Sequence, residues 1–492
     1  MTKVFKENRR NKFEIKGLWW TPDNPEQIPG ILIYEPNKIR LELTGVLGEE
    51  ELFGKKAPEI ICGFSNEGEQ FRLFPNLISG NTYSFSGFPT ETYDIDEFIA
   101  GVFEDGDFLS RDNIIFDSAA FYTDKLTSWL NPDVMQKATR IKPELNEDVM
   151  TLKYINVPTK AYYIDCINTA ISENYTINTN HNGEPNLETT IRTVSSFIFD
   201  PDKPQCLDWY LSKITSFKNL LMVLMGEPTK YIDFVLYNKE NDKKIKFFNK
   251  ELTNENKSNK SKSFIVKYKD IEEQFENLVK NWYLKQDSLK IVFELYLSDF
   301  YTKSFVETKL LNVIQTLEIY HRKADYIGKH FQDKDFNSYI TLLNNFIDSH
   351  LPKEASEKFK GKLTHANEYS LSKRLKEIIW DFEDDIIVLL FGSKKNAKKF
   401  INKLVDTRNY LTHYDPNNKK NILKDPYDQL SATTIVKVLL SFVFFKELGC
   451  NEMFIYSLIK KNISLMNRLF FAKEQLNMLE ESLKPKWEDP VF

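Results

Sequence analysis

Residues 404–418 read LVDTRNYLTHYDPNN, which has the spacing of a buried helix that also carries an arginine and a histidine. An α-helix turns by about 100° per residue, and this places Arg408 inside the apolar stripe of the segment. The apolar residues within about 60° of Arg408 on the helical wheel are Ala397, Ile401, Leu404, Val405 and Leu411. A permanently charged guanidinium is costly in such a stripe unless it meets an anion or a hydrogen-bond acceptor. The pattern therefore predicts a specific polar partner for Arg408.

Two more polar residues, Asn409 and His413, are i,i+4 neighbours at the edge of the same stripe. The helix ends within a few residues of His413, so its carbonyl groups favour the imidazolium form. Three polar groups thus converge where this helix meets its packing partner. The arrangement is most typical of a structural arginine paired with a carboxylate beside an ordinary helix-terminal histidine, and it also fits a catalytic pair.

The segments around this stretch also have helical periodicity. After about residue 295 the chain reads as helices, and the first of them puts Val306, Leu310, Val313, Leu317 and Tyr320 on one face. The helix that carries Arg408 begins at a Ser393 N-cap, and Pro416 prevents its extension. A last strong helix, TTIVKVLLSFVFFKELG, closes at Gly449. The C-terminal part is therefore predicted to be all-α.

The first half of the chain has the alternation of β-strands instead. Strands are predicted at KIRLELTG (38–45), EIICGF, QFRLF, YIDFVLY (231–237), KIKFF (244–248) and SFIVKY (263–268), with one helix at 207–225 that Gly226 and Pro228 stop. The fold class is α+β and multidomain, a β-rich N-terminal half followed by an all-α bundle. The predicted domains are 1–295, 296–465 and a helical tail at 466–492.

Composition limits the classes of function. The 492 residues carry a net charge of −5, with a local cluster of lysines at 394–403 that suits RNA despite the acidic total. The four cysteines are far apart, which favours a reducing cytoplasm over a disulfide scaffold or a zinc site. The longest apolar run, 435–445, is shorter than the roughly 20 residues a bilayer needs. We therefore expect a cytoplasmic protein with no membrane segment, metal or cofactor.

The helical half closely resembles a HEPN domain of the branch found in ApeA anti-phage proteins. The resemblance is carried by DTRNYLTHYDP as the R-x4-H motif, by LLNVIQTLEIYHRK as a first helix and by the closing LLSFVFFKELG. The opening GLWWTPDNPEQIPGILIYEPNKIRLELTGVLG resembles the start of the ApeA N-terminal domain. These stretches cover nearly the whole chain in the family's order.

The resemblance implies a metal-independent endoribonuclease that acts as a homodimer, with two R-x4-H motifs lining one cleft. Arg408 would hold the scissile phosphate, His413 would act as general acid or base, and Asn409 would orient the histidine or contact the phosphate. The implied partners are RNA, with tRNA as one candidate, and an unknown phage-derived trigger. The β-rich half would sense or regulate, and cleavage would arrest growth of the infected cell.

Four other residues are candidates for substrate binding. Glu318, His321 and Arg322 form a polar patch on the first predicted helix, which either faces the cleft or is a solvated helix face. Tyr414 follows the motif histidine and either stacks on a base or caps the core. Two other functions remain open: a non-catalytic HEPN module that binds RNA or protein, and a β-rich half that serves as a carbohydrate or peptide receptor.

Overall fold

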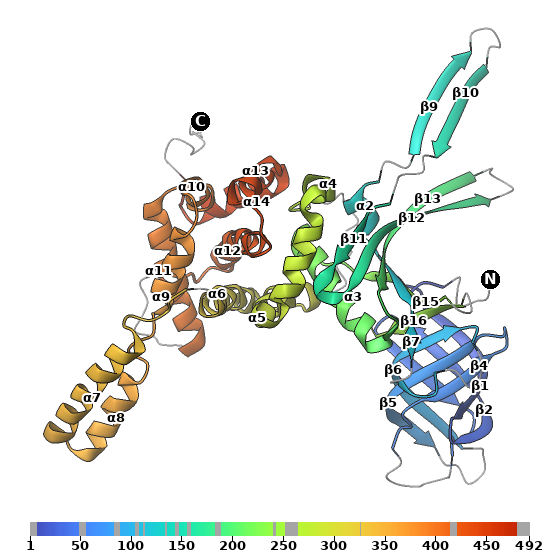
Figure 1. The fold of residues 1–492 in the computed structure, drawn as a ribbon, viewed down its shortest axis with the longest axis horizontal. Helices are drawn as coiled ribbons and strands as arrows, with labels where there is room; N and C mark the ends of the chain where they lie inside the picture. The colour runs from blue at the N-terminus through green and yellow to red at the C-terminus, as the bar shows by residue number, and fades with distance from the viewer. Residues whose placement is uncertain are drawn as a thin grey trace, which may run out of the picture. The chain divides into compact units, whose positions relative to one another are not determined.

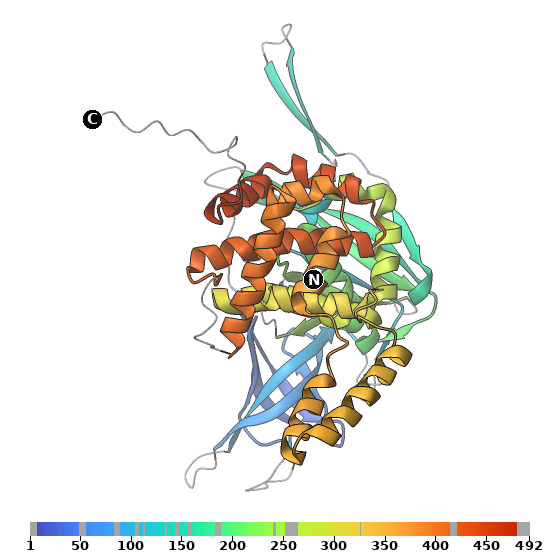
Figure 2. The same ribbon diagram turned by 90° about the vertical axis from the view of Figure 1, so that its left-hand side faces the viewer.

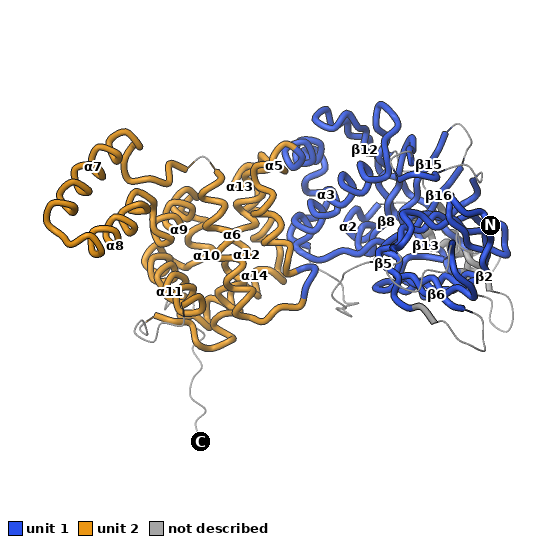
Figure 3. The backbone as a smooth tube through the Cα atoms, turned by 90° about the horizontal axis from the view of Figure 1, so that it is seen from below, with its two compact units in different colours: residues 1–283, 300–302 blue, residues 284–299, 303–492 orange. Residues whose placement is uncertain are grey.

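The chain folds into two compact units, Met1–Tyr283 with Phe300–Thr302 and Leu284–Asp299 with Lys303–Phe492 (Figure 3). The first is rich in strands and the second is helical (Figure 1), which confirms the predicted fold class. The computed structural model describes residues 7–479, apart from 49–55, 83–88, 104–107, 112–113, 133–134, 143–146, 155–158, 183–187, 240–242, 251–263, 325 and 414–420.

The first six strands close into an antiparallel barrel. They are β1 (Phe13–Thr21), β2 (Asn24–Glu35), β3 (Lys38–Leu43), β4 (Ile61–Ser65), β5 (Gln70–Thr82) and β6 (Thr90–Gly101). The ring runs β6-β3-β2-β1-β4-β5 and is completed by the pairing of β5 with β6. Closure leaves no free edge in the ring, so every strand has a neighbour on both sides.

Alternating apolar residues of these strands fill the barrel. Trp19, Tyr34 and Phe98 are fully buried, and the ring of Phe98 stacks on that of Phe248 with centroids 4.8 Å apart. Gly63 makes room for the indole, because a Cβ on it would lie 2.2 Å from the Trp19 ring. This barrel therefore has a packed interior.

The barrel continues into a second antiparallel sheet through β6, whose last residues pair with β16. From that strand the order is β16-β15-β8-β13-β12-β11. Their bounds are β8 (Ser118–Thr123), β11 (Ala161–Ile164), β12 (Thr169–Asn182), β13 (Glu188–Pro201), β15 (Tyr231–Asn238) and β16 (Lys243–Asn249). The smaller pairs are β7 (Ile115–Phe116) with β14 (Gln205–Cys206) and β9 (Met135–Lys142) with β10 (Glu147–Tyr154).

Helix α3 (Leu207–Met225) packs on this second sheet through the ring of Phe217, which contacts Phe121 and Phe199. Short helices α2 (Leu126–Leu130) and α4 (Tyr268–Ile271) complete the unit. The strands predicted at 231–237 and 244–248 and the helix predicted at 207–225 are confirmed.

The strand predicted at SFIVKY (263–268) is wrong. Residues 264–267 are irregular, and α4 begins at Tyr268. The backbone N–H groups of Ile265 and Val266 donate to the carbonyls of Met225 and Leu224 at the end of α3. An apolar, β-branched run thus caps a helix terminus instead of joining a sheet, and pattern alone does not separate the two uses.

The helical unit begins in the middle of a helix. Its elements are α5 (Phe275–Tyr301), α6 (Val306–Lys323), α7 (Asp333–His350), α8 (Lys353–Leu363), α9 (Leu371–Trp380), α10 (Asp384–Phe391), α11 (Lys394–His413), α12 (Pro426–Glu447), α13 (Glu452–Lys461) and α14 (Ile463–Gln475). The predicted boundary at 295/296 falls inside α5, and the one at 466 falls inside α14. Residues 480–492 of the predicted tail lie outside the described part of the chain.

Helix α12 is the core of this unit, with α6, α13 and α14 packed against it. By length and composition it could cross a membrane, and it is the one helix in the described part of the chain of which this is true. However, 72% of its most apolar window is buried inside the protein. That burial is typical of a core helix. The α7–α8 hairpin extends away from the other helices of its unit (Figures 1 and 2).

Candidate active site

Helix α11 positions the residues of the R-x4-H motif. It starts after Gly392, whose φ of +77° suits glycine, and the Ser393 hydroxyl accepts from the Asn396 N–H at 3.1 Å, as the predicted N-cap does. One face of the helix is buried through Ala397, Phe400, Ile401, Leu404 and Thr407. The backbone N–H of Leu423 donates to the Thr407 hydroxyl at 2.9 Å, so the covered face extends to that residue.

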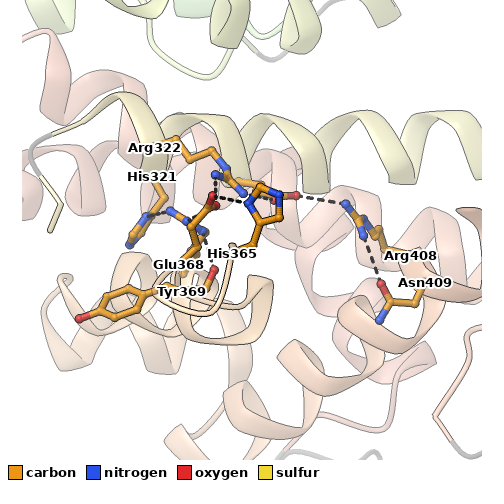
Figure 4. A network of polar contacts seen from close by, with 9 residues as sticks. His321, Arg322, His365, Glu368, Tyr369, Arg408 and Asn409 are labelled. Atoms are coloured by element: carbon orange, nitrogen blue, oxygen red, sulfur yellow. Dashed lines mark hydrogen bonds and ion pairs between the residues drawn. The ribbon is translucent and has the colours of Figure 1, made fainter. Parts of the chain in front are cut away.

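Arg408 lies on this face but near its C-terminal end. Its side chain is 34% exposed, which corrects the expectation of an arginine buried within the stripe. The helical wheel places Arg408 between the buried Ile401 and Leu404, but it cannot show that burial decreases toward the end of the helix, where residues 408–411 are half-buried. Arg408 does have the predicted partner: one guanidinium NH2 group lies 3.5 Å from Glu318 Oε2, and the other donates to Asn409 Oδ1 at 3.2 Å (Figure 4).

Glu318 comes from α6, which packs against α11. Its other oxygen, Oε1, accepts from Arg322 at 3.2 Å, so one carboxylate bridges two arginines. Arg322 donates in turn to Glu368 at 2.7 Å. This hydrogen bond raises the pKa of Arg322 and lowers the pKa of Glu368. The polar patch predicted on the first helix is therefore connected to Arg408.

His321 lies at the buried end of the same network. Its side chain is 0% exposed, so no substrate can reach it in this conformation. Arg374 donates to Nδ1 at 3.1 Å, and Nε2 lies 2.7 Å from Glu377. Because an arginine can only donate, Nδ1 must accept and Nε2 must carry the proton, which makes the ring neutral. Burial lowers the pKa of His321, in agreement with that state.

Arg374 plays the structural role that was the alternative for Arg408. Its side chain is only 3% exposed, Nε donates to the Tyr369 carbonyl at 3.0 Å, and NH2 lies 3.6 Å from Glu368. Burial lowers the pKa of Arg374. The sequence reasoning missed Arg374, although LSKRLKEIIW carries the same signal, a charged residue on an apolar helix face. It also missed Glu368 and Glu377, for which no pattern in the sequence stands out.

His413 lies in the last turn of α11 and is exposed. It follows Arg408 by five residues, which corresponds to about 7.5 Å along the helix axis. Asn409 is half-buried and contacts Arg408, so in this structure it orients the arginine. Tyr414 lies outside the described residues.

This arrangement suits an anionic ligand. Three guanidinium N–H donors of Arg408 have no acceptor among the residues that the structure describes. The helix also carries exposed lysines near its start, Lys395, Lys398 and Lys399, which add positive potential. No group of three or more His, Cys, Asp or Glu that could hold a metal ion occurs in the described part of the chain.

Comparison with known families gives two matches. The model described as ApeA N-terminal domain 1 matches residues 14–282, and the model described as Apea-like HEPN matches residues 311–454. No curated protein and no solved structure matches. The first match spans more than half of the 492 residues, and the second contains every residue of the network around Arg408.

Proposed function

Because this chain belongs to the ApeA family, with the ApeA N-terminal domain over more than half of its length and an Apea-like HEPN domain after it, we propose that it is an anti-phage effector that cleaves RNA. The HEPN domain is the nuclease, and the β-rich half senses or regulates. The substrate is host or phage RNA, with tRNA as the first candidate. Cleavage arrests growth of the infected cell.

The proposed reaction uses the nucleophile that RNA itself carries. The ribose 2′-OH attacks the adjacent phosphorus, the P–O5′ bond breaks, and a 2′,3′-cyclic phosphate and a 5′-hydroxyl result. One histidine takes the 2′ proton or gives a proton to O5′, which suits a group that titrates near neutrality. Arg408 stabilises the charge that develops on the phosphorane oxygens. None of these steps needs a metal ion.

The observation that carries this proposal is the contrast between Arg408 and Arg374. Arg374 is buried and its donors point to protein acceptors. Arg408 is one-third exposed, and its contact with Glu318 at 3.5 Å is longer than the 2.7–2.9 Å of a strong charge-assisted hydrogen bond. An arginine that is partly exposed at the surface is available to a phosphate, whereas one with a side chain only 3% exposed is not.

A two-fold dimer through α11 would complete the site. Within one chain the described groups around Arg408 offer a phosphate clamp and one histidine, while the reaction needs both an acid and a base. A second copy of α11 supplies the other histidine, and an isologous contact requires only one self-complementary surface. Arg408, Asn409 and His413 of both copies then line a common groove.

The test is cleavage of RNA by the purified full-length protein, with the ends of the products mapped. We expect 2′,3′-cyclic phosphate and 5′-hydroxyl ends, and cleavage that persists in excess EDTA. Arg408→Ala should lower the rate at least about 100-fold. Arg408→Lys should fail as well, because an ammonium cannot replace the planar, bidentate guanidinium.

Two control variants separate catalysis from folding. Lys461→Ala removes one exposed positive charge from α13, outside the lysine cluster at 394–403, and should leave the rate within about threefold. Arg374→Ala should lower the melting temperature, because it leaves the buried His321 Nδ1 atom and the Tyr369 carbonyl without their donor, whereas Arg408→Ala should not. Full activity of Arg408→Ala or His413→Ala would refute the mechanism. RNA binding without cleavage would identify the domain as a non-catalytic module, for which the Arg408–Glu318 pair would be structural.

A further inference from the structure

The α7–α8 hairpin exposes an unusual amount of apolar surface. Helix α7 contains no buried residue, although it packs against α8. The exposed fractions are 48% for Tyr339, 67% for Leu342, 45% for Leu343 and 61% for Phe346. Phe331, just before the helix, is 51% exposed and contacts the Tyr339 ring at 5.5 Å. Apolar side chains so concentrated on one short element are typical of a protein interface.

The four exposed residues of α7 form a continuous stripe. They follow each other at spacings of three and four residues and lie within about 60° of Tyr339 on the helical wheel. A stripe of this kind is the seam by which two helices pack side by side. The half-buried residues that face α8, Phe336, Ile340 and Ile347, lie on a neighbouring face of the helix. The stripe is therefore a second face that the hairpin itself does not use.

The stripe has a carboxylate at one end and an imidazole at the other. Asp335 precedes it and His350 follows it, both are exposed, and both lie on the same face as the apolar residues. The Nδ1 atom of His350 lies 2.8–2.9 Å from two acceptors within α7, the Ser349 hydroxyl and the Phe346 carbonyl. A partner would therefore bind at Nε2. Because Nδ1 donates to the Phe346 carbonyl, Nε2 carries a proton only in the imidazolium form, which can donate to an Asp335 carboxylate.

The stripe is complementary to itself when two copies run antiparallel. In that register Leu342 faces Leu343 of the other copy, Tyr339 faces Phe346, and Asp335 faces His350. A parallel pair would instead put Asp335 beside Asp335 and align the two helix dipoles unfavourably. The sequence of α7 thus matches one partner in particular, the same helix reversed.

We propose that α7 binds α7 of a second copy of this chain in an antiparallel, two-fold contact. The seam consists of Tyr339, Leu342, Leu343 and Phe346, and an Asp335–His350 hydrogen bond closes each end. The contact is separate from α11. A chain with self-complementary surfaces on both α7 and α11 assembles beyond a dimer, because each surface recruits a different neighbour.

The experiment measures the mass of the purified full-length protein by sedimentation over roughly 1 to 100 µM, the range in which weak contacts dissociate. Leu342→Asp buries a carboxylate at the centre of the seam and should raise the dissociation constant at least about 100-fold. Asn345→Asp adds the same charge on a face of α7 outside the stripe and should leave the mass distribution unchanged. At protein concentrations where the α7 contact is dissociated, both variants should keep the wild-type melting temperature, because both positions are exposed in the single chain.

A charge swap tests the antiparallel register. Asp335→Lys and His350→Glu should each weaken self-association by roughly two- to tenfold. By symmetry, each substitution removes the Asp335–His350 hydrogen bond at both ends of the seam. The double variant places the introduced ammonium of one copy beside the introduced carboxylate of the other and should recover wild-type association. The readout is mass and not cleavage, so it stands whether or not the ribonuclease proposal holds. Equal masses for wild type and Leu342→Asp would overturn the proposal, and so would a double variant weaker than both singles.

Discussion

At the scale of single residues, Arg408 is held by a group that resembles its proposed ligand. The Glu318 carboxylate and an RNA phosphate are both anions with two oxygens that suit a guanidinium. RNA must therefore displace Glu318 or share Arg408 with it. Because the Arg408–Glu318 contact is long and partly exposed, it costs little to exchange.

Replacing Glu318 by Gln should tighten RNA binding by roughly two- to fivefold. The amide keeps an acceptor for Arg408 but removes the competing negative charge. The measurement is RNA affinity in a His413→Ala background, where RNA is not cut. Glu368→Gln leaves the Arg408 contact intact and is the matched control. Weaker binding by the Glu318 variant would mean that the carboxylate holds Arg408 in its binding position.

His321 should make the stability of the protein depend on pH. Burial lowers its pKa in the folded state, so below about pH 6.5 the unfolded chain binds a proton that the folded one does not. Stability should therefore fall as the pH drops through that value, and the contribution is fully present above it. Thermal melts between pH 7.5 and pH 5 check this.

The His321→Gln variant should lose less stability on acidification than the wild type. The exposed His365, with a side chain 78% exposed, is the control position, and His365→Gln should follow the wild-type curve. Parallel curves for wild type and His321→Gln would show that His321 takes up no proton on unfolding.

The sequence allowed Arg408 to be selected but did not reveal its environment. A charged residue on an apolar face signals a polar partner, and Glu318 on α6 is that partner. The same signal at Arg374 marks a structural network, so the pattern identifies buried or half-buried charge and not its role. How far along a helix its neighbours cover the apolar face depends on tertiary packing, and that information is absent from the periodicity of one segment.

At the scale of elements, α5 belongs to both compact units. The part after Tyr283 packs within the helical unit, where Phe293 contacts the Phe444 ring at 5.4 Å and Tyr296 contacts it at 4.9 Å. Leu289, Val292 and Phe293 are buried. A fragment that starts at 296, the boundary predicted from composition, loses these three side chains.

A fragment of residues 284–492 should be clearly more stable than one of residues 296–492. Loss of a buried Leu or Phe side chain costs about 2–5 kcal/mol each. Thermal or urea unfolding of both fragments, carrying Arg408→Ala to avoid toxicity, gives the comparison. Equal stability would show that the start of the helical unit lies after residue 296.

The sequence predicted the presence of the helices better than the residues at which the domains begin and end. One predicted strand, at 263–268, was wrong. Strong 3.6-residue periodicity located α3, α11 and α12, with glycine stops for α3 and α12 and a serine N-cap for α11. The run at 263–268 failed because hydrogen bonds to the end of α3 compete with those of a sheet. The break between units was not predicted because α5 runs through it as one helix without proline or glycine, and the short polar run KQDS (285–288) beside it is also typical of an exposed helix face.

At the scale of the whole molecule, the proposed two-fold cleft makes activity depend on concentration. Specific activity per chain should fall as the protein is diluted below the dissociation constant of the α11 contact. An excess of Arg408→Ala chains should inhibit the wild type by forming mixed dimers. Cleavage assays across a dilution series, with mass measured in parallel, test both effects.

The Leu342→Asp variant is the control for this series, because it removes the α7 contact and leaves α11 intact. Its activity should follow the same dilution curve as the wild type. A specific activity that stays constant on dilution, with a monomeric mass throughout, would contradict the composite cleft. Arg408 would then have a structural role.

The closure of the barrel has a consequence for how the protein is made. All six strands of the ring lie within Phe13–Gly101, and β16 later adds Phe248 to their core. The ribosome thus completes the barrel early, whereas Arg408 and His413 emerge near the end of synthesis. At 5–20 residues per second, roughly 15 to 60 s separate the two events. A nascent chain therefore contains all six strands of the barrel well before it contains the residues of the proposed ribonuclease site.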